Sequence, residues 1–220
     1  MIIANNILKH SLQNVFFLSG TAMAGKTTMA NALKEKYGFI HFNDNWHEDN
    51  FKEWTSICDK EYQIKTTRRN ALTNEEYFDR TVDEFLAEGD YNGYSEYLEY
   101  AIIELIKLSQ KSRVVADVDV PLGLLTKISV FNRIACMLVS PGLITCESYG
   151  RREDHKEFLE CILALKEPEK KIAVQDELFR IHAEKAFIEA RKYKLFSIVR
   201  SENSTVEDTL KMLEEHFQLT

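Results

Sequence analysis

The sequence predicts an α/β domain in which a parallel sheet of five strands is covered by helices on both faces. Five short apolar runs alternate with segments of helical periodicity, which is the order expected of a parallel sheet with crossover helices. The first apolar run leads directly into the pattern G-x-x-x-x-G-K-T at residues 20–27. This pattern predicts a phosphate-binding loop between a buried strand and the start of a helix.

The predicted elements follow one another along the chain. The strands are expected at residues 15–19, 39–42, 113–120, 134–139 and 194–199. The helices are expected at residues 26–37, 74–87, 95–110, 147–166 and 168–192, followed by a last helix after residue 205. Three of them have recognisable ends, because Gly38 is a typical C-cap and Thr73 and Thr205 are typical N-caps.

Composition narrows the function classes. The 220 residues are 45% hydrophobic and 29% charged, which suits one α/β domain. A net charge of -7 argues against a nucleic-acid surface. No apolar run is long enough for a membrane span, and the N-terminus lacks the layout of a signal peptide. Four cysteines without C-x-x-C spacing indicate reduced thiols in a cytoplasmic protein and no zinc site. The sequence leaves a homodimer open.

The phosphate loop supplies the first candidate site residues. Backbone N–H groups would wrap a phosphate, and Lys26 would bridge the β- and γ-phosphates of ATP. The Thr27 hydroxyl would be a ligand of Mg²⁺. The alternative is an ordinary strand-to-helix turn that carries a lysine. The predicted nucleotide-binding residues are Gly20, Thr21, Ala22, Met23, Ala24, Gly25, Lys26, Thr27 and Thr28.

Carboxylates follow the second and third predicted strands, where ligands gather in open α/β sheets. Asp44 would accept a proton from a hydroxyl or bind Mg²⁺ through water, unless it only caps a helix. Asp117 and Asp119 lie on one face of a strand, and an aspartate inside an apolar strand requires a partner or a cation. We predict Asp117 as a metal ligand beside Thr27. A capped turn before Pro121 is the alternative.

With these motifs, the sequence resembles the small P-loop kinases of the adenylate, shikimate and nucleoside kinase group. No Asn-Lys-x-Asp motif is present, which disfavours a GTPase. The segments Ser-Pro-Gly-Leu at 140–143 and Arg-Arg-Glu-Asp-His-Lys at 151–156 look most similar to a poorly characterised set of bacterial nucleotide-kinase-like proteins.

The resemblance implies a P-loop NTPase fold with strand order 2-3-1-4-5. It implies one kinase-like domain over residues 1–220. The core would cover about 14–50 and 112–220, with a helical acceptor-binding insert at about 51–110 and a lid at about 144–172.

The resemblance also implies roles for single residues. Asp44 would occupy the acceptor-binding or base position. Arg151 and Arg152 would lie in the lid and contact the transferring phosphate, although arginines on a charged helix are often only solvated. Residues 200–203 would lie where such kinases contact adenine. We expect His41 to be a structural histidine with satisfied ring nitrogens.

These expectations combine into one function with one rival. The chain is expected to be an ATP-dependent phosphotransferase with Mg²⁺, acting on a nucleoside, a nucleotide or another hydroxyl-bearing metabolite, with no nucleic-acid or membrane partner. The alternative is a nucleotide-binding regulatory ATPase module without a small-molecule acceptor.

Overall fold

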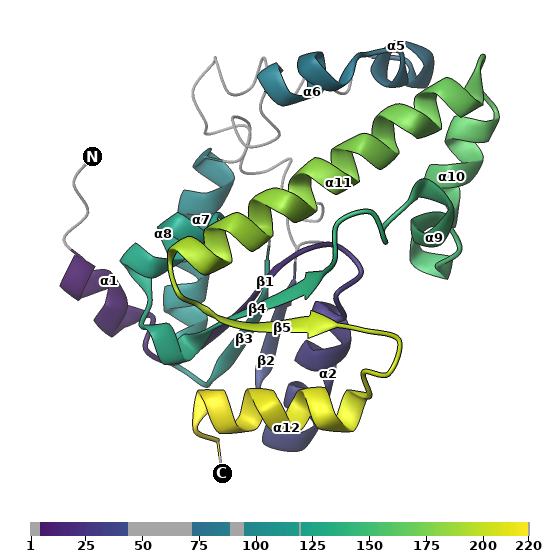
Figure 1. The fold of residues 1–220 in the computed structure, drawn as a ribbon. Helices are drawn as coiled ribbons and strands as arrows, with labels where there is room; N and C mark the ends of the chain where they lie inside the picture. The colour runs from purple at the N-terminus through teal and green to yellow at the C-terminus, as the bar shows by residue number, and fades with distance from the viewer. Residues whose placement is uncertain (1–4, 44–71, 89–94, 119, 220) are drawn as a thin grey trace. The chain divides into compact units, whose positions relative to one another are not determined.

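Five strands lie side by side in one parallel sheet, in the order β2-β3-β1-β4-β5 (Figure 1). Their bounds are β1 (Val15–Gly20), β2 (Ile40–Asn43), β3 (Val114–Asp117), β4 (Ile134–Val139) and β5 (Phe196–Arg200). The strand order and the uniform direction are those of the P-loop NTPase fold, so the predicted fold class is confirmed.

The structure is a computed structural model that describes residues 5–43, 72–88, 95–118 and 120–219. The chain forms two compact units. The first unit contains residues 1–46, 100–140 and 183–220, and the second contains residues 47–99 and 141–182. The sheet belongs to the first unit. The predicted division into core, insert and lid stays a prediction.

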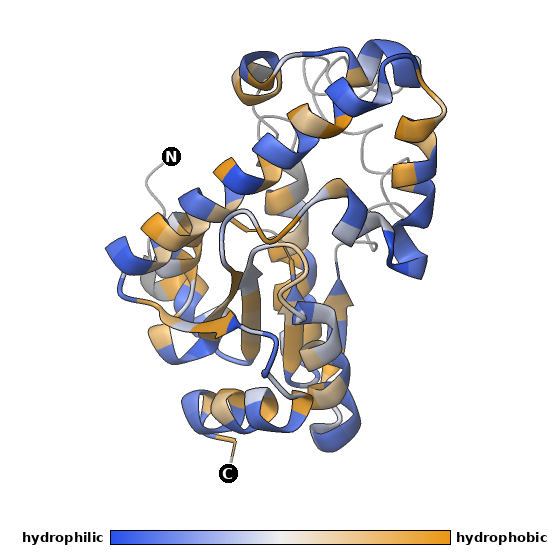
Figure 2. Cartoon of the chain, turned by 45° about the vertical axis from the view of Figure 1, so that its right-hand side comes forward, coloured by the Kyte–Doolittle hydropathy of each residue, from blue (hydrophilic) through white to orange (hydrophobic). Residues whose placement is uncertain are grey.

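The middle of the sheet is the core of the first unit. Every residue of β3 and β4 is buried, as are residues 15–19 of β1. Parallel strands covered on both faces need continuous apolar sequence, and Figure 2 shows the strands as hydrophobic among helices of mixed colour. On the edge strand β5 only Ile198 is buried.

Helices cover the sheet of the first unit. Its helical elements are α1 (Asn5–Ser11), α2 (Lys26–Tyr37), α8 (Leu122–Ile128), η1 (Phe131–Arg133) and α12 (Val206–Phe217), and α7 (Ser95–Ser109) and α11 (Pro168–Lys192) each run from one unit into the other. Helix α12 packs against α2, and α1 packs against α8 (Figure 1). None of the described helices is long and apolar enough to cross a membrane.

Three predicted helix ends are confirmed. Gly38 has a left-handed conformation at the end of α2, and its N–H bonds to the Lys34 carbonyl. The Thr205 side chain accepts a hydrogen bond from the Asp208 N–H at the start of α12. Thr73 forms a capping box at the start of its helix. Each of these residues satisfies a backbone group that a helix end leaves without a partner.

The prediction of one helix over residues 74–87 is wrong. The second unit has two short helices there, α5 (Asn74–Phe78) and α6 (Val82–Glu88). The Thr81 N–H donates to Glu84 Oε2 at 2.7 Å, and the Glu84 N–H donates to Thr81 Oγ1 at 3.3 Å. This second capping box starts a new helix, which the shared apolar periodicity of the two segments conceals.

The prediction of one helix over residues 147–166 is also wrong. The chain forms α9 (Cys146–Gly150), η2 (Glu153–His155) and α10 (Lys156–Leu163) instead. A Cβ at Gly150 would lie 2.3 Å from Leu159 Cβ. The glycine therefore lets α9 and α10 pack closely within the second unit.

Three cysteines lie in the described part of the chain, and all three are free thiols: Cys136, Cys146 and Cys161. Burial raises the pKa of Cys136 to about 12 and raises that of Cys146 as well. Both therefore stay protonated and unreactive near neutral pH. Cys58 lies outside the described residues.

Candidate active site

The phosphate loop leaves β1 by a turn that requires glycine. Gly20 has a φ of 126°, and a Cβ there would lie 2.0 Å from the Met137 carbonyl oxygen of β4. Met23 and Gly25 also have positive φ angles, of 56° and 87°. Loops of this kind turn backbone N–H groups into an anion-binding concavity. Gly25 caps α2 without a side-chain hydrogen bond, which leaves N–H groups of the first turn available to an anion.

Thr21 holds the loop against the sheet. Thr21 is only 5% exposed. Its Oγ1 accepts a 2.7 Å hydrogen bond from the Val139 N–H. Its own N–H donates to the Met137 carbonyl at 3.0 Å. Thr21 thus extends the ladder between β1 and β4 beyond the end of the strand. Sequence reasoning placed this residue in the loop but missed the role of its hydroxyl, which no short motif indicates.

Lys26 lies back over the loop. Its Nζ donates a 2.8 Å hydrogen bond to the Thr21 carbonyl oxygen, five residues earlier. A phosphate oxygen is a stronger partner for an ammonium group than a neutral carbonyl, because the bond is then between opposite charges. The lysine is therefore placed to transfer to an anion held by the loop.

Thr27 and Asp117 meet across the fold. Thr27 Oγ1, in the first turn of α2, donates a 2.6 Å hydrogen bond to Asp117 Oδ2 at the end of β3. Asp117 is 5% exposed. A carboxylate and a hydroxyl are the hard oxygen ligands that Mg²⁺ accepts, with its remaining positions filled by phosphate oxygens and water. These two residues therefore fit the predicted cation. Asp119 lies outside the described residues.

His41 departs from its predicted role. On β2, its Nδ1 lies 3.1 Å from Asn31 Oδ1 of α2. Its Nε2 is buried without a hydrogen-bond partner among the described residues, and it lies 3.9 Å from Asp117 Oδ2. The prediction of a fully satisfied histidine is wrong, because only one ring nitrogen is bonded.

A pocket of about 110 Å³ opens beside the phosphate loop. This volume is of the order of cavities that accept a single aromatic ring, roughly 150 Å³. The pocket is lined by Ala24, Gly25, Thr28, Met29, Met137, Ile198, Arg200, Ser204, Thr205, Val206 and Thr209.

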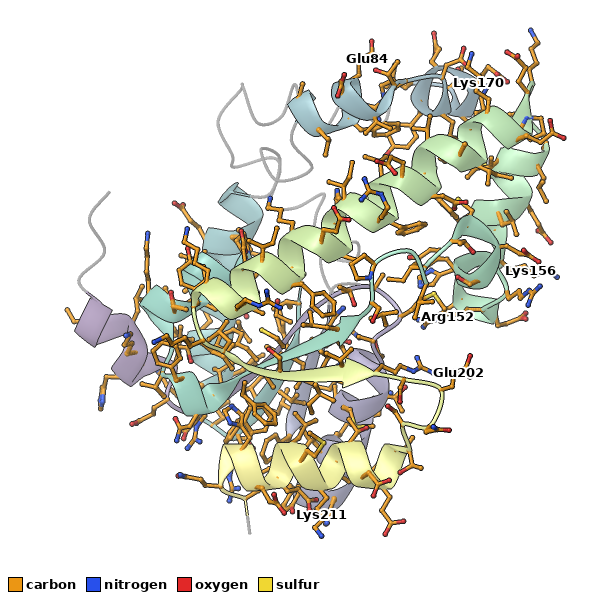
Figure 3. All side chains as sticks on the ribbon, in the orientation of Figure 1. Glu84, Arg152, Lys156, Lys170, Glu202 and Lys211 are labelled. Carbon is orange, nitrogen blue, oxygen red and sulfur yellow. The ribbon has the colours of Figure 1, made fainter. Side chains whose placement is uncertain are left out.

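Arg200 joins this pocket to the loop. Its Nη1 donates a 2.6 Å hydrogen bond to the Met23 carbonyl oxygen. This bond places the start of the segment between β5 and α12 beside the phosphate loop. Figure 3 labels Glu202 in this segment.

Arg151 and Arg152 belong to the second unit. Arg151 pairs with Glu147. Arg152, labelled in Figure 3, donates to both Asp154 oxygens, from Nε at 3.0 Å and from Nη2 at 2.5 Å. This bond lowers the pKa of Asp154. The predicted contact of both arginines with phosphate stays a prediction.

Asp44 lies outside the described residues, so its predicted role also stays a prediction. Among the predicted site residues, the structure brings together the loop from Gly20 to Thr28 and Asp117.

Comparison with protein-family models finds no match, and neither does comparison with curated protein sequences. Among solved structures, the shikimate kinase from Bacteroides thetaiotaomicron is similar with a TM-score of 0.43 and 16% identity, over 93% of this chain and 98% of that chain. The shikimate kinase from Acinetobacter baumannii in complex with shikimate is similar with a TM-score of 0.40 and 16% identity, over 94% of each chain. Both TM-scores lie below 0.5, so the fold assignment rests on the strand order and phosphate loop of this chain itself.

Proposed function

We propose that the chain is an ATP-dependent phosphotransferase that acts on a small hydroxyl-bearing acceptor. One observation carries the proposal. The phosphate loop, its lysine and a hydroxyl–carboxylate pair converge at the carboxyl ends of β1 and β3. A triphosphate needs this combination of amide donors, a mobile ammonium group and a site for a divalent cation.

The proposed catalytic roles follow from the negative charge on the phosphoryl group that is transferred. In phosphoryl transfer, the protein positions the reactants and neutralises charge on the phosphate oxygens. The loop amides and Lys26 would hold the β- and γ-phosphates. Thr27 and Asp117 would hold Mg²⁺, which neutralises phosphate charge when it is bound. Arg151 and Arg152 would exchange their carboxylate partners for the transferring phosphate.

The pocket beside the loop supports ATP as the donor. Its apolar walls come from Met29, Met137, Ile198 and Val206, which suit the two faces of a planar base. A guanine site needs an acceptor for its two N–H donors, and none of the described residues that line this pocket is an aspartate or a glutamate.

The acceptor is proposed only by class, as a nucleoside, a nucleotide or another metabolite with a free hydroxyl group. Asp44 would accept the hydroxyl proton, because it directly follows the end of β2, the strand next to β3. A carboxylate at that place can act as a general base for an acceptor next to the γ-phosphate.

The test begins with ligand binding. The full chain is screened with a non-hydrolysable ATP analogue and a panel of nucleosides, nucleotides and sugars, and the melting temperature is measured. A ligand that binds only the folded state raises it. The compounds that raise it further in the presence of the analogue are then tested as acceptors by their effect on ATP consumption.

Asp44→Ala tests the proposal against its rival, and Lys26→Ala tests the nucleotide binding that both require. Asp44→Ala is expected to bind the analogue normally and to lose transfer to the acceptor, and Lys26→Ala is expected to lose triphosphate binding. If nucleotide binds but no compound in the panel raises ATP turnover, the phosphotransferase assignment is wrong. A regulatory nucleotide-binding module then remains.

A further inference from the structure

Polar side chains connect the middle of α2 to the candidate cation site. His41 Nδ1 lies 3.1 Å from Asn31 Oδ1 on one side. On the other side, His41 Nε2 lies 3.9 Å from Asp117 Oδ2. The same Oδ2 accepts the 2.6 Å bond from Thr27. The three elements α2, β2 and β3 thus meet at one carboxylate.

His41 Nε2 is the atom among these polar side chains whose burial has no explanation so far. The side chain of His41 is only 8% exposed, and Nε2 has no hydrogen-bond partner in the described part of the chain. A buried polar atom without a partner costs free energy, so native proteins rarely keep one without a reason. Here the atom faces the carboxylate that the cation would use.

For the neutral ring of His41, one tautomer satisfies Asn31, His41 and Asp117 together. A neutral imidazole donates from one nitrogen and accepts at the other. If Nε2 accepted, its lone pair would face the carboxylate of Asp117. If Nε2 donates, its proton points at that carboxylate, and Nδ1 accepts from the amide N–H of Asn31 once that amide is turned so that its nitrogen, in place of Oδ1, faces the ring. Half a turn of an amide exchanges its donor and acceptor ends.

We propose that His41 is a positioning residue of the divalent-cation site, whose Nε2–H fixes the orientation of Asp117. A distance of 3.9 Å is longer than a hydrogen bond, so the inference requires the two groups to come about 1 Å closer when Asp117 binds the cation. The inference rests on the proposed function, because it requires the Thr27–Asp117 pair to hold the cation of a bound nucleotide. Partners that orient a ligand typically change metal affinity by about 10- to 100-fold.

The test uses Mn²⁺ as the probe. The full chain is titrated with Mn²⁺ in the presence of a non-hydrolysable ATP analogue, and free Mn²⁺ is measured by EPR. His41→Phe keeps a ring of similar size and removes both nitrogens, so its Mn²⁺ affinity is expected to fall about 10- to 100-fold. His41→Gln retains an amide N–H donor and is expected to recover most of that loss.

His216 provides a matched control for a purely structural role. It is a histidine of the same unit, stacked on Phe196 at 4.1 Å, with its Nε2 2.9 Å from the Ile134 carbonyl oxygen. His216→Ala is expected to lower the melting temperature and to leave the Mn²⁺ affinity unchanged. A residue that only supports the fold behaves like this control.

Two results would overturn the inference. The first is a His41→Phe variant whose Mn²⁺ affinity stays within about twofold of the wild type. The second is a nitrogen coupling between His41 and Mn²⁺ in pulsed EPR, which would make His41 a direct ligand. Binding of the analogue in EDTA separates this test from the proposed function. If the analogue binds the wild type neither in EDTA nor with Mn²⁺, the proposed function fails. If it binds all variants equally while Mn²⁺ affinity differs as stated, the inference stands.

Discussion

Thr27 Oγ1 and Asp117 Oδ2 are joined by a 2.6 Å hydrogen bond between residues 90 positions apart in the sequence. The bond ties the first turn of α2 to the end of β3. It brings a buried carboxylate to the place where the phosphate loop begins its helix. A carboxylate in such a setting is stabilised by a cation more than by a neutral hydroxyl alone, so the pair suits the divalent ion of the proposed function.

Removal of the Thr27 hydroxyl is expected to abolish most of the effect of Mg²⁺ on nucleotide binding. Thr27→Val keeps the shape of the side chain and removes the oxygen that the cation would use. Calorimetry with a non-hydrolysable ATP analogue should show an affinity at least about tenfold lower in Mg²⁺ and unchanged in EDTA. Thr27→Ser retains the hydroxyl and should behave like the wild type. An equal loss in both buffers would mean that Thr27 shapes the loop and does not hold the cation.

Lys26→Ala is expected to weaken triphosphate binding at least about tenfold, because the loop loses its only formal positive charge and about 1.4 kcal/mol or more of binding free energy. The melting temperature of the free protein should change little, since within the described part of the chain the lysine donates its one hydrogen bond to the Thr21 carbonyl. Fluorescence titration with a labelled ATP analogue measures the affinity.

Lys34→Ala is the control for this change, because Lys34 is an exposed lysine of the same helix. Its affinity for the analogue should match the wild type. If Lys26→Ala also matched the wild type, the loop would not bind phosphate.

The sheet and the phosphate loop could be predicted from the sequence because both depend on local patterns. A buried parallel strand is apolar along its length, and a phosphate loop needs glycine at fixed positions. Helices α2 and α11 begin and end at the predicted residues. In each of these cases, one segment of sequence contains the whole signal.

The interruptions within the two predicted helices could not be predicted from apolar periodicity. The apolar positions of α5 and α6 keep a helical spacing across the break, and only the capping box of Thr81 and Glu84 reveals a new start. At the second break, Gly150 is needed because an added Cβ would meet Leu159, a residue of the next helix. The first break therefore has a sequence signal in the Thr-x-x-Glu pattern at 81–84 that periodicity does not use, whereas the contact at Gly150 is visible only in the packing.

The residues of the candidate site also divide into those that a local pattern predicts and those that depend on contacts between distant segments. Lys26 and Thr27 were predicted from the motif, and Asp117 from its cost inside an apolar strand; the structure brings the three together, and their roles stay predictions. The contact of Thr21 with Val139 and the proximity of His41 to Asp117 were not predicted, because these pairs are far apart in sequence and are brought together by the strand order. Contacts between strands depend on register, which no single motif contains.

Gly20→Ala is expected to destabilise the fold strongly. The new Cβ would lie 2.0 Å from the Met137 carbonyl oxygen, and this backbone oxygen of a central strand cannot move away. We expect a loss of at least about 3 kcal/mol in the free energy of unfolding, measured by urea denaturation.

Gly38→Ala is the matched control for this clash. Gly38 also has a positive φ, of 68°, but nothing lies within 4 Å of an added Cβ. Only the left-handed backbone is then penalised, by about 1 kcal/mol. Equal losses in the two variants would show that conformation, and not the contact with β4, makes Gly20 necessary.

The ion pair between α2 and α12 is expected to make stability depend on pH. Lys36 Nζ lies 2.6 Å from Glu214 Oε1, and Glu214 is 6% exposed. The hydrogen bond from Lys36 lowers the pKa of Glu214 below its ordinary value of 4.5, against the opposing effect of burial. Because the folded-state pKa is below the unfolded one, the pair contributes stability above pH 4.5, and this contribution is lost as the pH falls through the folded-state pKa.

Glu214→Gln tests this pH dependence. Its melting temperature should lie below that of the wild type near neutral pH, and the difference should shrink as the pH is lowered below 4.5. Glu215→Gln, at the exposed neighbouring position, should follow the wild type throughout. Because Gln has nearly the same shape as Glu, a melting temperature equal to that of the wild type at every pH would mean that packing, and not the charge of Glu214, joins the two helices.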